Sequence, residues 1–147
     1  MIKPYKISVP KSTLNNIYKK VRAYPWKMMQ NVDGWEYGTN YNFLKKISKY
    51  WVSKYNWNKF ENKINSFKNY KTNVDGINLH FIVEKSKNPK SRPLLLLHGW
   101  PGSVIEFFNI IPRLAHPEKF GGKIEDGLMS LSPLYQDLVF LHQLKKL

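Results

Sequence analysis

The chain has 147 residues, and its 24 lysines and arginines outnumber 10 aspartates and glutamates, giving a formal net charge of +14. This length suits one ordinary domain, and a hydrophobic fraction of 42% with 15% aromatics is typical of a globular protein and excludes a disordered tail. Cysteine is absent, which excludes a disulfide framework and a zinc site built from thiolates.

The N-terminal part of the chain predicts an extended arm followed by three helices. Prolines keep residues 1–10 extended, and Ser12 is placed to cap the first helix, which ends before Pro25. An irregular, aromatic-rich segment covers residues 25–38, and Asn40 is placed to cap the second helix. Each helix carries one apolar stripe: Leu14, Ile17, Tyr18 and Val21 in the first, Leu44, Ile47, Trp51 and Tyr55 in the second, and Trp57, Phe60 and Ile64 in the third.

Two strand-like segments follow the helices. Residues 68–74 and 77–84 are joined by Asp75-Gly76, a dipeptide that strongly favours a tight β-hairpin turn. His80 lies on the mixed face of the second strand with no carboxylate beside it in the sequence. We therefore expect His80 to be a hydrogen-bonded structural histidine rather than an acid or base.

The segment from Arg92 to Ser103 carries the strongest functional signal. Leu94–Leu97 has no polar face and predicts a central strand buried on both sides. Two glycines and a proline between His98 and Ser103 force a sharp loop, and apolar residues at helical spacing over 104–114 predict an amphipathic helix directly after it. Because a helix start presents backbone N–H groups, this arrangement predicts an anion site or an oxyanion hole. The alternative is a strand-to-helix turn without a chemical role.

This strand, loop and helix resemble the oxyanion-loop region of α/β-hydrolases, and His-Gly-Trp-Pro-Gly-Ser is similar to the form found in epoxide hydrolases of the microsomal and juvenile-hormone type. The helices resemble the N-terminal region of that family through Tyr50-Trp51, Tyr55-Asn56-Trp57, Glu61 and Asn65. Asn56 and Asn58 stand where the family usually has an acid and a base, so a local ion pair is lost. This N-terminal region also favours epoxide hydrolases over lipases, peptidases and dehalogenases of the same fold.

The resemblance covers roughly residues 2–127 and implies an incomplete α/β fold. Residues 1–67 would be the family's N-terminal helical arm, and residues 68–127 would be the first strands, oxyanion loop and first helix of the hydrolase core. Within the loop, the resemblance makes the Trp100 backbone N–H an oxyanion donor. It also implies that Gly99 lets the chain pass close to substrate and that Pro101 fixes the loop through a cis Trp-Pro bond. The expected oxyanion loop therefore consists of His98, Gly99, Trp100, Pro101 and Gly102.

The family reaction, as the resemblance implies it, converts a small epoxide to a vicinal diol. An aspartate opens the epoxide to form an ester, lid tyrosines supply a proton, and a carboxylate-oriented histidine activates the water that cleaves the ester. This sequence has no Gly-x-[Ser/Asp]-x-Gly nucleophile elbow. Its aspartates lie in turn-like or tail contexts, its histidines have no nucleophile to serve, and their spacing does not suit zinc; the residues concerned are Asp33, Asp75, Asp126, Asp137, His116 and His142.

We therefore expect a chain that is cut off before its catalytic residues, inactive alone, and without cofactor or metal. The alternative is a non-catalytic interaction module that docks on an intact hydrolase. Lysines are spread from Lys3 to Lys146, so we expect a solvated basic surface, with weak polyanion association as the alternative and no specific nucleic-acid binding. No apolar run approaches the ~18 residues of a membrane helix and no leader is visible, so we expect a cytoplasmic protein without a membrane span.

Residues 128–147 form an atypical tail. With suitable codons, Leu128 to Leu141 is what a one-base slip would produce from Phe-Asn-Val-Ile-Val-Pro-Ser-Leu-Pro-Gly-Phe-Gly-Phe-Ser, the type of strand and loop with which the family continues. We hypothesise a frameshift near codon 128. Because the neighbours of the Leu94–Leu97 strand would lie in missing sequence, we expect an open sheet edge and self-association through it.

Overall fold

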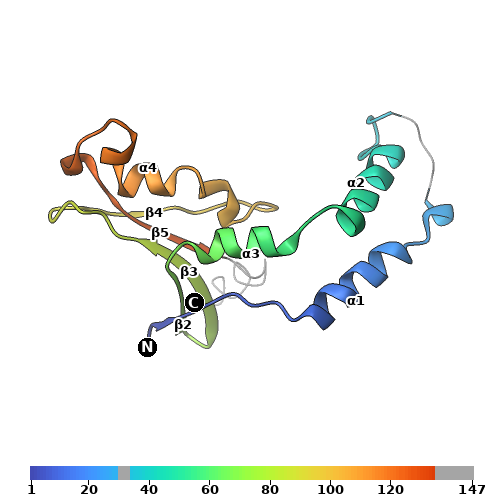
Figure 1. The fold of residues 1–147 in the computed structure, drawn as a ribbon, viewed down its shortest axis with the longest axis horizontal. Helices are drawn as coiled ribbons and strands as arrows, with labels where there is room; N and C mark the ends of the chain where they lie inside the picture. The colour runs from blue at the N-terminus through green and yellow to red at the C-terminus, as the bar shows by residue number, and fades with distance from the viewer. Residues whose placement is uncertain (30–33, 135–147) are drawn as a thin grey trace. The chain divides into compact units, whose positions relative to one another are not determined.

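The computed structural model describes residues 1–29 and 34–134, which divide into two units (Figure 1). A helical unit comprises residues 8–61, and a sheet unit combines residues 1–7 with the chain from residue 62 onward. Asp33, Asp137, His142 and most of the predicted tail lie outside the described residues. No helix in the described ranges is long and apolar enough to cross a membrane.

The helical unit contains α1 (Lys11–Arg22), the 3-10 helix η1 (Trp26–Met28), α2 (Tyr41–Ser53) and the start of α3 (Trp57–Asn65). All three predicted α-helices are present. The predicted cap at Ser12 is wrong, because the carbonyl of Pro10 accepts from the Leu14 N–H (3.2 Å) and α1 already begins at Lys11. The predicted cap at Asn40 is confirmed, since its side chain accepts from the Phe43 N–H at 3.0 Å.

Within the described residues, five strands form the sheet: β1 (Lys3–Pro4), β2 (Asn69–Val74), β3 (Ile77–Glu84), β4 (Pro93–Leu95) and β5 (Met129–Leu134). Their order is β1-β2-β3-β5-β4, and only the β4–β5 pair is parallel. The extended N-terminal arm thus pairs with β2 along one sheet edge. The β2–β3 hairpin is confirmed, and Asp75 and Gly76 both have positive φ (51° and 84°), as a tight two-residue turn requires.

The position of β4 differs from the prediction of a central strand with both faces buried. β4 is an edge strand of the described sheet and pairs only with β5. Leu94 and Leu96 are half-buried, whereas Leu95 and Leu97 are 55% and 53% exposed. The prediction fails because a run of leucines shows only that a strand is apolar. Whether both of its faces are buried depends on which other elements pack on them.

β5 was not predicted as a strand, because its residues were assigned to the atypical tail. It lies between β3 and β4, and its serines Ser130 and Ser132 are buried. The alternation of serine with Met129, Leu131 and Pro133 is the period-two pattern of a strand, and this signal was present in the sequence.

The predicted helix over 104–114 is also interrupted. The chain forms a 3-10 helix η2 (Val104–Phe107), a turn, and a five-residue α4 (Ile111–Ala115), followed by the 3-10 helices η3 (Pro117–Phe120) and η4 (Ile124–Asp126). Pro112 explains the break, because inside a continuous helix it would remove the bond to the Phe108 carbonyl and clash with it. These segments still bury apolar side chains against the sheet, and the described core consists of Ile64, Phe67, Phe81, Ile82, Val104, Phe108, Ile111 and Ala115.

Candidate functional site

The predicted oxyanion loop begins at the carboxyl end of β4. The pairing of β4 with β5 continues one residue beyond the strand, since the Leu96 N–H donates to the Leu131 carbonyl at 2.8 Å. His98 therefore follows the paired region by two residues, beyond the carboxyl end of β4. Ligands of open α/β sheets bind outside the carboxyl ends of the strands, so the loop occupies a suitable place for a site.

A four-residue turn from Gly99 to Gly102 fixes the shape of the loop. The Gly102 N–H donates to the Gly99 carbonyl at 2.7 Å, with Trp100 and Pro101 at the two central positions. The Trp100–Pro101 peptide bond is cis, which confirms the prediction for this bond. The turn therefore closes on its own backbone, as a turn with cis-proline at its third position does.

The donor predicted by the family resemblance is the Trp100 backbone N–H. Within the described part of the chain, no group accepts a hydrogen bond from it. The Trp100 side chain is 80% exposed, so the indole does not cover the loop with a packed ring. The expected contribution of a long helix is missing, because η2 has four residues and its Ile105 N–H already bonds to Ser103 Oγ at 3.3 Å. Any anion stabilisation would therefore depend on the loop's own N–H groups.

The two glycines of the loop differ in what surrounds them. A side chain at Gly102 would meet the Glu106 carboxylate and would place its Cβ 2.8 Å from the Gly99 carbonyl oxygen. Because real Cβ contacts are not this short, any other residue at 102 would displace the turn. Gly99 has nothing within 4 Å of its missing Cβ and faces open space. Glycine at 102 is thus required by packing, whereas Gly99 leaves room beside the backbone.

Neither described aspartate belongs to the loop, and the carboxylate that lies against it is that of Glu106, beside Gly102. Asp75 lies in the β2–β3 turn and Asp126 in η4, and both are exposed. The described ranges also contain no group of three or more His, Asp or Glu side chains that could hold a metal. Of the sequence-predicted site, the structure brings together only the loop residues 98–102.

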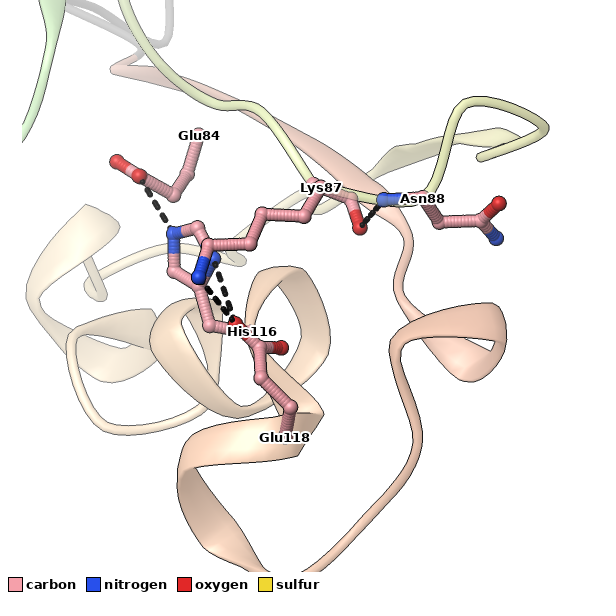
Figure 2. Close-up of polar contacts among 6 residues, drawn as sticks. Glu84, Lys87, Asn88, His116 and Glu118 are labelled. Carbon is pink, nitrogen blue, oxygen red and sulfur yellow. Dashed lines mark hydrogen bonds and ion pairs between the residues drawn. The ribbon is translucent and has the colours of Figure 1, made fainter.

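A histidine–carboxylate cluster that sequence reasoning missed lies elsewhere (Figure 2). His116 Nε2 lies 3.0 Å from Glu84 Oε1, His116 Nδ1 lies 3.9 Å from Glu118 Oε1, and Lys87 Nζ lies 3.5 Å from the same Glu118 oxygen. Desolvation raises the pKa of the Glu118 carboxyl, but its own backbone N–H, the nearby Lys87 ammonium and the charge of His116 outweigh this effect and hold the pKa below its usual value. The members are too far apart in sequence for spacing to reveal them.

The register shows that this cluster does not serve the loop. Glu84 at the end of β3 is opposite Ser130, and Ser130 is also the partner of Leu94 near the start of β4. The cluster therefore lies at the amino ends of β4 and β5, whereas the loop lies beyond their carboxyl ends. Its role is to join the end of β3 to the α4–η3 segment.

His80 is a structural histidine, as predicted. It is 5% exposed, and its Nε2 lies 2.9 Å from Asn69 Oδ1. The Asn69 Nδ2 donates to the carbonyls of Ile64 and Phe67, both at 2.8 Å, so its Oδ1 must accept and His80 Nε2 must donate. Burial, and secondarily the charge of Lys71 opposite it on β2, lower the pKa of His80 from 6.5 to about 4.

This lowered pKa predicts a pH-dependent stability. Above the unfolded value of 6.5, His80 is neutral in both states and the stability is fully present. As pH falls from 6.5 to about 4, only the unfolded chain takes up the proton, so the free energy of unfolding should fall, by at most about 1.4 kcal/mol per pH unit. Urea unfolding at several pH values measures this slope. His80→Gln should flatten it, and an equal slope in that variant would assign the effect to other groups.

The family model and the curated relatives that match this chain all name epoxide hydrolases. Residues 2–107 match the family described as "Epoxide hydrolase N terminus". A putative epoxide hydrolase of Stigmatella aurantiaca (strain DW4/3-1) is 40% identical over 132 residues, which is 90% of this chain and 30% of the relative. Juvenile hormone epoxide hydrolase 1 of Ctenocephalides felis is 37% identical over 119 residues, or 79% of this chain and 26% of the relative.

Solved structures agree in fold. Juvenile hormone epoxide hydrolase from the silkworm Bombyx mori matches with a TM-score of 0.74 and 31% identity, over 91% of this chain and 36% of that chain. Aspergillus niger epoxide hydrolase matches with a TM-score of 0.73 and 25% identity, over 91% and 35%. The chain thus spans 26–30% of the length of the relatives named above and 35–36% of these solved chains.

Proposed function

The chain belongs to the epoxide hydrolase N-terminal family, and from this premise we propose that it is the N-terminal part of an enzyme that adds water to an epoxide. The reaction would pass through an ester between substrate and enzyme and would release a vicinal diol. The described part contributes the helical arm and the first strands of an α/β-hydrolase fold.

Within that enzyme, residues 98–102 would hold negative charge on an oxygen. The observation that carries this assignment is the Trp100 N–H, which has no acceptor in the described residues and belongs to a turn closed by the Gly102–Gly99 hydrogen bond. A fixed donor at the carboxyl end of a strand can stabilise an oxyanion without reorganising when the charge develops. Open space beside Gly99 would let the reacting oxygen approach the backbone.

The 147-residue polypeptide alone would not complete the reaction. The oxyanion that the loop would stabilise forms only after a nucleophile has made the ester and a base has activated the water that attacks the ester carbonyl. The sequence contains no nucleophile elbow, and His116 is held by Glu84 at the opposite ends of the strands from the loop. The loop would therefore have no intermediate to stabilise.

The coding DNA tests whether the tail arises from a frame slip. We expect that shifting the frame by one base near codon 128 restores a segment of the type Pro-Ser-Leu-Pro-Gly and opens a reading frame beyond codon 147. That restored frame should also encode a Gly-x-Asp-x-Gly elbow. Sequencing the genomic locus and its transcript gives the answer. A shifted frame that meets stop codons at once would refute the frameshift but leave the family membership unchanged.

A second function, docking on an intact hydrolase, is favoured by one further observation. The apolar stripes of α1 and α2 line a groove of about 480 Å³ in the helical unit. Its side chains Ile47, Tyr50 and Trp51 remain 44%, 50% and 41% exposed. No residue of either helix is buried, so the stripes depend on a further partner for cover. Co-purification of this chain with an intact relative would support docking.

A further inference from the structure

A second groove of the helical unit is basic. It has a volume of about 470 Å³ and is lined by residues from the end of α1, from η1 and from α2. Arg22, Lys45, Lys46 and Lys49 line it. The sequence did not predict this cluster, because Arg22 is separated from the three lysines by more than twenty residues. The fold thus produces a concentration of charge where the sequence predicted an even distribution.

This basic groove is distinct from the apolar groove. Successive residues of an α-helix are about 100° apart, so Lys45, Lys49 and Val52 fall on one face of α2 and Ile47 and Trp51 on the opposite face. The first group lines the basic groove and the second lines the apolar groove. A protein covering the apolar groove would therefore leave the basic face of α2 accessible.

Within the described residues, no carboxylate neutralises the charges in the basic groove. Arg22 Nη2 donates to the carbonyl of Val52 at 3.2 Å, and Lys45 Nζ lies 5.1 Å from the centre of the Tyr41 ring. Among the described residues, no aspartate or glutamate forms an ion pair with any of the four cations. Residues 8–61 contain ten lysines and arginines but three acidic residues, so this unit has a strongly positive field.

From this groove we propose that the helical unit docks on an anionic lipid bilayer. Lysines and arginines on one face of an amphipathic helix attract negatively charged headgroups, and aromatic side chains favour the boundary between headgroups and acyl chains. Tyr37, which is 90% exposed just before α2, is such a side chain, whereas the Trp35 ring packs on Phe43, on the face of α2 opposite Lys45 and Lys49. Membrane contact would add peripheral attachment to the proposed function and does not depend on it.

A nucleic acid fits the groove less well. Single-stranded nucleic acids bind where bases stack on open aromatic faces beside basic residues. Trp26 is the aromatic residue of the groove, and its ring already contacts Tyr24 and Tyr41, with centroids 4.7 Å and 5.9 Å away. The lysines would attract phosphate in either partner, but no aromatic face in the groove is free to receive a base.

Vesicle flotation tests the proposal, because only protein attached to lipid rises through a sucrose gradient and self-associated protein does not. The full chain should float with phosphatidylcholine vesicles containing about 30% phosphatidylserine at about 0.1 M salt, should not float with pure phosphatidylcholine, and should detach at about 0.5 M salt. The triple variant Lys45→Gln, Lys46→Gln and Lys49→Gln should bind roughly 100-fold more weakly, since each basic residue near an anionic surface contributes about fivefold in affinity.

Two matched variants separate the groove from bulk charge. Changing Lys68, Lys85 and Lys90 to glutamine removes the same charge from exposed positions in the sheet unit and should change binding by less than about threefold, because these side chains lie outside the groove. Replacing Lys45, Lys46 and Lys49 with arginine should retain binding, and circular dichroism checks that helix content is unchanged. Equal losses in both glutamine variants, no binding to anionic vesicles, or weakened binding of a single-stranded DNA probe with unchanged flotation would each overturn the proposal.

Discussion

Purified as the 147-residue polypeptide, this protein should convert an epoxide to its diol no faster than buffer does. Enzymes owe accelerations of about a millionfold or more to groups that act on the reacting atoms. Here the Trp100 N–H, the proposed donor for negative charge, has no acceptor in the described residues, but the sequence supplies no elbow nucleophile to form the ester that would carry that charge. Chromatographic detection of diol from a reactive aryl epoxide, over hours and at high protein concentration, measures the rate.

The control must distinguish a trace of host hydrolase from the chain itself. Gly102→Val suits this purpose, because a side chain at 102 collides with the Gly99 carbonyl and displaces the turn, while residue 102 lies outside the buried core. Diol formation that is equal in both preparations belongs to a contaminant. Diol formation that disappears with Gly102→Val would show that the chain is catalytic and would contradict the expected inactivity.

The largest physical effect is expected at the free edge of β4. This strand pairs on one side only in the described sheet, and residues 93–97 contain no charge to discourage pairing with another chain. We therefore expect the protein to elute from a sizing column as oligomers rather than at the monomer mass of 17.4 kDa. Because the net charge is +14, salt should screen the repulsion between copies and increase the association.

Leu95→Lys should convert these oligomers largely to monomer. Leu95 is 55% exposed, so lysine costs the fold little, but its charge would lie against the incoming strand. Ile124→Lys is the matched control, since Ile124 is 41% exposed and lies in η4 rather than in the edge strand. Monomeric wild-type protein, or equal dissolution of oligomers by both substitutions, would rule out association through β4.

Local features of the fold followed from the sequence. The Asp75-Gly76 turn and the Asn40 cap were predicted from a few neighbouring residues and are present, and so is the cis Trp100–Pro101 bond that the family resemblance implied. The apolar stripes of the helices were equally readable, because helical periodicity is a property of one segment. The loop could be identified for the same reason, since its residues are consecutive.

Errors arose where a competing local rule or a distant partner decides the structure. Pro112 divides the predicted helix, and the carbonyl of Pro10 replaces Ser12 as the start of α1. The Glu84–His116 pair spans 32 residues and needs the sheet register to bring its members together. The basic groove requires α1 and α2 to pack before Arg22 can meet the α2 lysines.

The sequence by itself determined the three N-terminal helices, the hairpin and the position of the loop at residues 98–102, because each is encoded by residues close together in the chain, and its resemblance to epoxide hydrolases indicated the family. Only the tertiary structure decided that β5 separates β3 from β4, that β4 forms an edge, and that the His116 cluster lies away from the loop. Strand order and side-chain clusters depend on hydrogen bonds and packing between distant segments. The sequence of an apolar strand does not show which segment will pair with it or pack on it.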